Sequence, residues 1–250
     1  HDLAHLSQIP GSELPYGVIQ RGTHPAVVRS GADVWPGVTL DTTLGPIVIA
    51  AGVKIRPSAV IVGPAFIGED SMIMDRAHIK AHTAIGPRCK VGGEVGGTIF
   101  QGLSNKSHEG HLGDSWVGEW VNFGAGTNNS NLLNTYAEVI AKASPGGSNE
   151  RTGQTFLGTI VGDHVKFAIS TRIMTGAVVH MGAMFAASTP VVGCIDRFTW
   201  ATDSGSTAFR LPRFIDTAKT VMARRGIEPS DAYLNRLKEL HESASGANAS

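Results

Sequence analysis

The sequence predicts an all-β protein, a parallel β-helix built from six-residue repeats, and three observations lead to this fold class. Aliphatic residues recur at intervals of six over eight consecutive repeats: Ile49, Ile55, Ile61, Ile67, Ile73, Ile79, Ile85 and Val91. Four residues after each of them stands a small or modest side chain, from Val53 to Val95. The chain also contains 31 glycines and 12 prolines, which suit the many tight corners of such a coil.

The period of six distinguishes this fold from the common alternatives. An α-helix with 3.6 residues per turn would not keep a six-residue stripe on one face. A simple alternating strand would not restrict the second inward position to small residues. Very short strands joined by tight corners satisfy both conditions, because the aliphatic side chains then stack in inward columns along the axis.

Further repeats lie on both sides of the central run. They begin with Val28, Val34 and Leu40, continue with Val117 and Phe123, and resume from Val161 to Phe185. The eighteen repeats form about six coils if three repeats close one turn. We therefore predict a β-helix over residues 1–195.

The repeats are interrupted twice. They lapse between Gly96 and Gly113 in a polar stretch, and again between Thr127 and Gly158. A loop as long as the second interruption is uncommon in a compact domain unless it serves a function or is disordered. We predict a loop insertion at 128–158 that either covers a site or is slack.

The repeat pattern ends after Pro190, and residues 196–245 are predicted to form a mainly helical extension. Two extended pieces precede an amphipathic helix with Pro212 near its start and Gly226 after its end. Ser230 is placed to cap a second helix with an apolar stripe. Residues 246–250 are predicted to be a disordered tail.

Composition restricts the partners. The formal net charge is zero, so the chain has no electrostatic reason to bind nucleic acid or an anionic membrane. No apolar run approaches the eighteen residues of a membrane span. The two cysteines are too few for a disulfide framework, and we expect a cytoplasmic protein.

The motifs around His108 carry a resemblance to a known family. His108 stands six residues before Asp114, and the run Asn122-Phe123-Gly124-Ala125-Gly126-Thr127 follows. This arrangement resembles the acetyltransferase half of the bifunctional N-acetylglucosamine-1-phosphate uridyltransferases. The segments 89–95, 104–108 and 118–120 are similar to those of a group of sugar nucleotidyltransferase-like proteins in that family. The resemblance implies the left-handed β-helix of the hexapeptide-repeat acyltransferases.

The resemblance also implies a function. It is that of an acyl-coenzyme A-dependent N-acyltransferase, with acetyl-CoA as co-substrate and an amino-sugar phosphate or nucleotide sugar as acceptor. His108 matches the general base, and the substrate-binding positions match Asn122, His111 and Glu94. The positions that contact acetyl-CoA match Ala125, Asn131 and Ala187. No metal is implied. The family forms homotrimers with sites between subunits, and a nucleotidyltransferase domain is expected upstream of His1.

Three positions depart from the family pattern. A substrate-contacting tyrosine is replaced by His111, a lysine that holds the sugar phosphate by Gly96, and a serine near the coenzyme by Ile169. Lys80, Arg76 and Lys90 are other candidates for binding the phosphate.

Two alternatives therefore stay open. One is a non-catalytic β-helix that trimerises or regulates a nucleotidyltransferase. The other is a zinc enzyme resembling γ-class carbonic anhydrases, which the ten histidines make worth testing.

Overall fold

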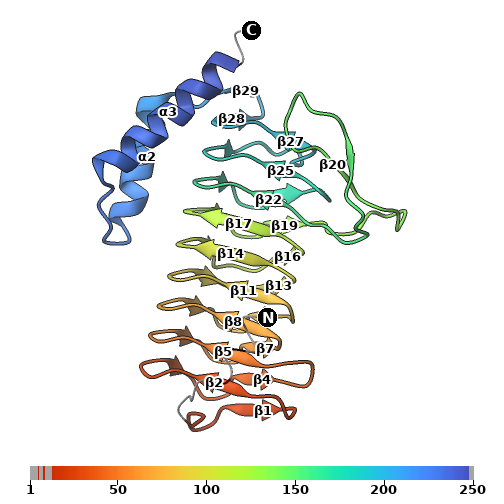
Figure 1. Cartoon of the computed structure of the whole chain (residues 1–250), viewed down its shortest axis with the longest axis vertical. Coiled ribbons are helices and arrows are strands. Elements are labelled where there is room, and N and C mark those ends of the chain that lie inside the picture. Colours follow the sequence, from red (N-terminus) through yellow and green to blue (C-terminus); the bar gives the residue numbers. More distant parts are fainter. Residues whose placement is uncertain (1–4, 6–7, 9–12, 248–250) are drawn as a thin grey trace.

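The computed structural model describes residues 5, 8 and 13–247, and this part of the chain forms nine stacked coils followed by two helices (Figure 1). A complete coil consists of three short strands joined by corners. Each strand pairs in parallel with the strands of the coils before and after it, so that the solenoid has three flat faces.

The strands of the three faces alternate along the chain. Face 1 contains β1 (Ile19–Arg21), β4 (Thr39–Asp41), β7 (Val60–Val62), β10 (His78–Ile79), β13 (Glu94–Gly96) and β16 (His111–Gly113), followed by the pair β19 (Asn128–Asn129) and β24 (Arg172–Ile173). Face 2 contains β2 (Ala26–Val28), β5 (Ile47–Ile49), β8 (Ala65–Ile67), β11 (Thr83–Ile85), β14 (Ile99–Gly102), β17 (Trp116–Glu119), β22 (Ile160–Val161), β25 (Val178–Val179) and β27 (Cys194–Ile195). Face 3 contains β3 (Asp33–Val34), β6 (Lys54–Ile55), β9 (Met72–Ile73), β12 (Lys90–Val91), β15 (Asn105–Lys106), β18 (Asn122–Phe123), β23 (Lys166–Phe167), β26 (Met184–Phe185) and β28 (Thr199–Thr202).

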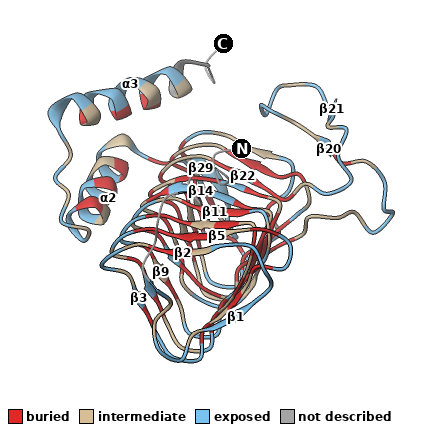
Figure 2. Ribbon diagram, turned by 60° about the horizontal axis from the view of Figure 1, so that its bottom comes forward, coloured by how far each residue is buried: buried red, intermediate tan, exposed pale blue. Residues whose placement is uncertain are grey.

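The coil is left-handed. Figure 2 brings the N-terminal coils forward, and in this view the chain runs counterclockwise from β1 through β2 to β3 while it moves away from the viewer. This is the hand that the resemblance implies, although crossovers between parallel strands are right-handed in most proteins.

The predicted inward columns form the core, which confirms the fold class. All eight aliphatic side chains from Ile49 to Val91 have no solvent exposure. The small residues between them are also buried, and Ser71 satisfies its hydroxyl by donating to Gly86 O at 2.8 Å and accepting from Cys89 N at 2.9 Å. Burial of each isoleucine side chain contributes about 1.5–3 kcal/mol relative to exposure.

The prediction of about six coils is too low, because the described chain forms nine. The stretch 96–113 does not interrupt the solenoid but forms β14 and β15. Its coil is shorter than the central ones: Phe100 pairs with Ile85, fifteen residues earlier, whereas Ile79 pairs with Ile61, eighteen earlier. Two inward positions also hold the buried polar residues Lys106 and Asn129, which hide the aliphatic period.

A long excursion leaves face 1 between β19 and β22. It carries a two-stranded antiparallel hairpin of β20 (Ile140–Ala141) and β21 (Glu150–Arg151), which projects away from the solenoid (Figure 1). Val139 is buried, whereas Tyr136, Ile140 and Phe156 are more than half exposed.

The C-terminal segment closes the last coil. β28 lies in parallel beside β26 and extends the solenoid beyond residue 195, and β29 (Gly205–Ala208) then turns back antiparallel to β28. Helices α2 (Leu211–Ala223) and α3 (Asp231–Ala247) follow, with Pro212 in the first turn of α2. Because α3 continues through Ala247, residues 246 and 247 are helical, and the rest of the predicted tail lies outside the described residues.

The helices pack against the solenoid through a separate apolar cluster. Its buried members are Phe198, Phe209, Phe214, Ala218 and Leu237. In the described part of the chain, no helix has the length and apolar character needed to cross a membrane.

Candidate active site

His108 lies at the corner that leads from β15 on face 3 to β16 on face 1, with its side chain exposed. The next corner of this edge stacks directly on it, since a Cβ atom added to Gly110 would lie 2.2 Å from Thr127 O. Ser170 N donates to Ala125 O at 2.7 Å, and Ala168 N donates to Phe185 O at 2.9 Å. The corners that carry His108, Ala125, Ile169 and Ala187 therefore stack along one edge of the solenoid.

A buried lysine supports the His108 corner from inside. Lys106 is 2% exposed, and its Nζ donates to the carbonyl oxygens of His108 at 2.9 Å and Gly92 at 3.3 Å. Burial lowers the pKa of the Lys106 ammonium to about 8, partly opposed by the charge of Glu109. The two carbonyl bonds hold the backbone of residue 108 against the preceding corner.

Glu94 and His111 are neighbours on face 1. They are direct partners in the register of β13 and β16, and Glu94 Oε1 lies 3.4 Å from His111 Nδ1. Lys80 Nζ donates to the same oxygen at 2.7 Å. This hydrogen bond, together with the positive charge of Lys80, lowers the pKa of Glu94, so the carboxylate is ionised at neutral pH.

His111 and Asn131 meet above Gly113. A Cβ atom at position 113 would lie 2.6 Å from His111 Nε2 and 2.7 Å from Asn131 Nδ2. Any residue other than glycine would therefore displace the ends of both side chains. The Asn131 amide donates to Asp114 Oδ2 at 2.6 Å. These residues line a shallow cavity of about 460 Å³ with Lys80 and His82.

Lys80 also occupies the space above Gly96. A Cβ atom at position 96 would lie 3.0 Å from the Lys80 Cβ and 3.2 Å from its Cδ. The preceding coil therefore supplies a cation over Gly96. Lys80 is one of three candidate phosphate-binding cations, with Arg76 and Lys90, and the sequence alone does not distinguish among them.

The asparagines of β19 anchor this region and were missed as a group. Asn128 Oδ1 accepts from His111 N at 2.7 Å, and the buried Asn129 Oδ1 accepts from Gly113 N at 2.8 Å. Side-chain amides thus take the place of a backbone ladder between β16 and β19. The run of four polar residues at 128–131 was the available signal.

Asn122 lies apart from the other predicted substrate residues. It is half-buried on face 3, where Asn105 Nδ2 donates to its Oδ1 at 3.5 Å. Its neighbour in the next strand is Lys166, and α2 lies over this part of the face. The structure therefore places Glu94, His111 and Asn131 together on face 1, His108 at the adjoining edge, and Asn122 around that edge on face 3.

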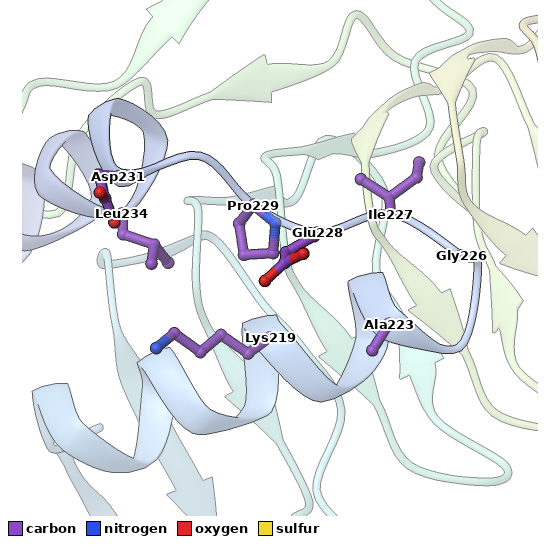
Figure 3. Close-up of a pocket in the computed structure, with 8 residues that line it drawn as sticks. All are labelled: Lys219, Ala223, Gly226, Ile227, Glu228, Pro229, Asp231 and Leu234. Carbon is purple, nitrogen blue, oxygen red and sulfur yellow. The ribbon is translucent and has the colours of Figure 1, made fainter.

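Two other features lie outside this region. A crevice of about 550 Å³ between α2 and the linker to α3 contains none of the predicted site residues (Figure 3). Within residues 13–247 and at positions 5 and 8, no group of three or more His, Cys, Asp and Glu side chains is placed to hold a metal ion.

Comparison with known proteins shows several relatives. No protein-family model matches the chain. The bifunctional protein GlmU of a Picosynechococcus species is 29% identical over 128 residues, which cover 50% of this chain and 27% of the relative. GlmU of a Synechococcus species is 34% identical over 93 residues, 36% of this chain and 20% of the relative. A bifunctional sugar-1-phosphate nucleotidylyltransferase/acetyltransferase of Sulfurisphaera tokodaii is 31% identical over 134 residues, 53% of this chain and 33% of the relative.

A solved structure, that of a Francisella novicida UDP-N-acetylglucosamine acyltransferase, matches with a TM-score of 0.34 and 16% identity over 91% of this chain and 77% of that chain. The chain spans about a third or less of the length of these curated relatives. The chain is thus similar over about half of its length to bifunctional GlmU proteins and to a bifunctional sugar-1-phosphate nucleotidylyltransferase/acetyltransferase, which confirms the resemblance predicted from its sequence.

Proposed function

We propose that the chain transfers an acyl group, acetyl in the simplest case, from acyl-coenzyme A to the amine of an amino-sugar phosphate or nucleotide sugar. The observation that carries the proposal is the stacking of the His108, Ala125 and Ala187 corners along one edge, beside the polar cluster on face 1. Similarity to a relative named as an acetyltransferase supports acyl transfer as the reaction class.

His108 is the proposed general base. The acceptor amine attacks the thioester carbonyl, and His108 takes a proton from the attacking nitrogen as the C–N bond forms. The C–S bond then breaks, and the coenzyme leaves as a thiolate that receives a proton. Backbone N–H groups at the corners are suited to stabilise the oxyanion of the tetrahedral intermediate. Ala125 and Ala187 are proposed to contact acetyl-CoA through their backbone.

The acceptor is proposed to bind over face 1. His111 is oriented by Glu94 and presents its Nε2 to the cavity. Beside it lies the amide of Asn131, which is proposed to contact the coenzyme. Lys80 offers a cation for the sugar phosphate where the family lysine is absent. Asn122 contributes to this site only if the ligand extends around the edge to face 3.

Assembly into a homotrimer is part of the proposal. The outward row of face 2 is apolar, with Ile99, Trp116 and Ile160 in consecutive strands and each 40–44% exposed. Exposed apolar rows of this kind mark interfaces, and a second copy of the chain is the simplest partner in a closed ring. Trp116→Asp is expected to produce monomers in sedimentation, whereas a monomeric wild type would refute the assembly.

The function is tested by following thiol release from acetyl-CoA with a panel of amino-sugar phosphates. The wild type is expected to bind coenzyme A in calorimetry and to transfer the acyl group. His108→Ala is expected to keep coenzyme A affinity and lose roughly 10²–10⁴-fold in turnover. A wild type that neither binds coenzyme A nor acylates any amino sugar would refute the transferase and favour the scaffold, which the apolar row on face 2 also fits.

A further inference from the structure

A second polar groove lies on face 3, where the end of α2 meets the solenoid. We call it the face 3 groove; its volume is about 370 Å³. Four cationic side chains line it, Lys90, Lys166, Arg224 and Arg225, together with the amides of Asn105 and Asn122. No carboxylate is among the residues that line it.

The strand register sets the spacing of these groups. Lys90, Asn105, Asn122 and Lys166 are consecutive partners across four strands of face 3. Adjacent strands are about 4.8 Å apart, so the two lysines stand at the ends of a row of roughly 14 Å. The amides between them supply hydrogen-bond donors and acceptors that carry no charge.

Arg225 fixes the helical side of the groove. Its guanidinium donates to Asn105 Oδ1 at 2.6 Å and to Arg88 O at 2.8 Å, and Arg88 donates back to Arg225 O. The end of α2 is thereby attached to face 3. Arg224, the adjacent residue, is exposed and has no side-chain hydrogen bond in the described part of the chain.

The hydrogen-bond acceptors of Lys166 and Arg225 are all neutral groups. Lys166 Nζ donates to Trp120 O at 2.7 Å and His164 O at 3.0 Å, which leaves one ammonium N–H without a protein acceptor. Burial lowers the pKa of Lys166 to about 7. Burial, together with repulsion from Arg88 and Arg224, lowers the pKa of Arg225. Buried charges are normally paired, so the neutral surroundings of Lys166 and Arg225 favour an anion, and the exposed Lys90 and Arg224 add positive charge beside them.

We propose that the face 3 groove binds the phosphate of a small phosphorylated ligand, with Lys90, Lys166 and Arg224 supplying charge and Asn122 a hydrogen bond. Phosphate suits this set because it is multiply charged and accepts several charge-assisted hydrogen bonds. The site is distinct from the cluster on face 1, and its occupancy does not depend on acyl transfer. A sugar phosphate and the 3′-phosphate of coenzyme A present the same chemical group.

Calorimetry with orthophosphate and pyrophosphate tests the proposal on the full chain. The wild type is expected to bind pyrophosphate in the micromolar to millimolar range, and the double variant Lys90→Ala/Arg224→Ala at least about tenfold more weakly. Both residues are exposed, so the fold should be retained. Lys54→Ala is the matched control, because Lys54 is an exposed lysine on the same row of face 3, two strands from Lys90 and outside the groove.

Three results would overturn the site: no binding of either probe by the wild type, equal binding by the double variant, or an equal loss in Lys54→Ala. The source of the phosphate is found by comparing coenzyme A with dephospho-coenzyme A, and glucosamine 1-phosphate with glucosamine. A preference that the double variant abolishes identifies the natural class. Because these are binding measurements, they are read independently of whether any acyl transfer is detected.

Discussion

Replacing Lys106 with methionine tests whether a buried ammonium holds the His108 corner. The methionine side chain is similar in length and fills the inward space between Val91 and Phe123, but it donates no hydrogen bond. The carbonyls of His108 and Gly92 then lose the donor that Lys106 provides. Under the proposed function, turnover should fall while coenzyme A binding persists, since the corner keeps its backbone contacts.

The magnitude of the charge effect follows from the pKa. The pKa of the Lys106 ammonium falls from 10.5 to about 8 on folding. This shift means that folding with the ammonium protonated costs about 3 kcal/mol. Between these two values the unfolded chain holds a proton that the folded chain has released. The wild type therefore gains stability as the pH rises from 8 to 10.5, and it is below pH 8 that the destabilisation is fully present.

Urea unfolding of the two proteins, followed by circular dichroism, measures this contribution. The free energy of unfolding of the wild type minus that of Lys106→Met should increase by about 3 kcal/mol from below pH 8 to above pH 10.5. Other titrating groups, including Lys166, are common to both proteins and cancel. The free energy of unfolding of Lys54→Met, a change at an exposed position, should vary with pH in the same way as that of the wild type. If the free energy of unfolding of Lys106→Met also varies with pH as that of the wild type does, Lys106 is not a buried cation.

Four further changes have defined outcomes. His111→Ala should raise the acceptor KM more than it lowers kcat, and steady-state kinetics showing the opposite split would make His111 the base. Gly113→Ala should also raise that KM without unfolding the protein, because the new methyl group displaces the tips of His111 and Asn131; unchanged kinetics would place the acceptor elsewhere. Ile67→Ala should reduce unfolding free energy by about 2–5 kcal/mol in urea titrations, against a smaller effect for the half-buried Phe66→Ala, and a loss below about 1 kcal/mol would contradict the inward column. Deleting residues 134–153 should impair acceptor use or sedimentation as a trimer while circular dichroism stays that of the folded solenoid, and no change in either would show that the hairpin is slack.

The central coils could be predicted from the sequence because one residue type, isoleucine, fills one inward column of their core. From Ile49 to Ile85 every sixth residue is isoleucine, and no other regular structure keeps such a row on one side. The coils around Lys106 and Asn129 were undercounted, since their inward positions are polar and their spacing is shorter than eighteen residues.

The same shortening explains what could be predicted of the candidate site. Glu94 and His111 are seventeen residues apart, and a strict period of eighteen would have placed Leu112 beside Glu94. Their contact therefore becomes visible only with the register. Lys80 over Gly96 is also a relation between coils rather than within a motif. The position of α2 over Asn122 depends on how the C-terminal extension folds back onto face 3. The six-residue repeats carry no information about that packing.

The reversal of direction at β29 has a consequence for how copies of this chain meet. A parallel solenoid that ended at β28 would offer an edge of the same polarity and spacing as every coil inside it, so further chains could join end to end and grow into a fibre. The antiparallel β29 presents an edge that another first coil does not match. The aromatic cluster of Phe198, Phe209 and Phe214 anchors this hairpin beneath α2, so that the face 3 edge of the last coil is unsuited to end-to-end strand addition.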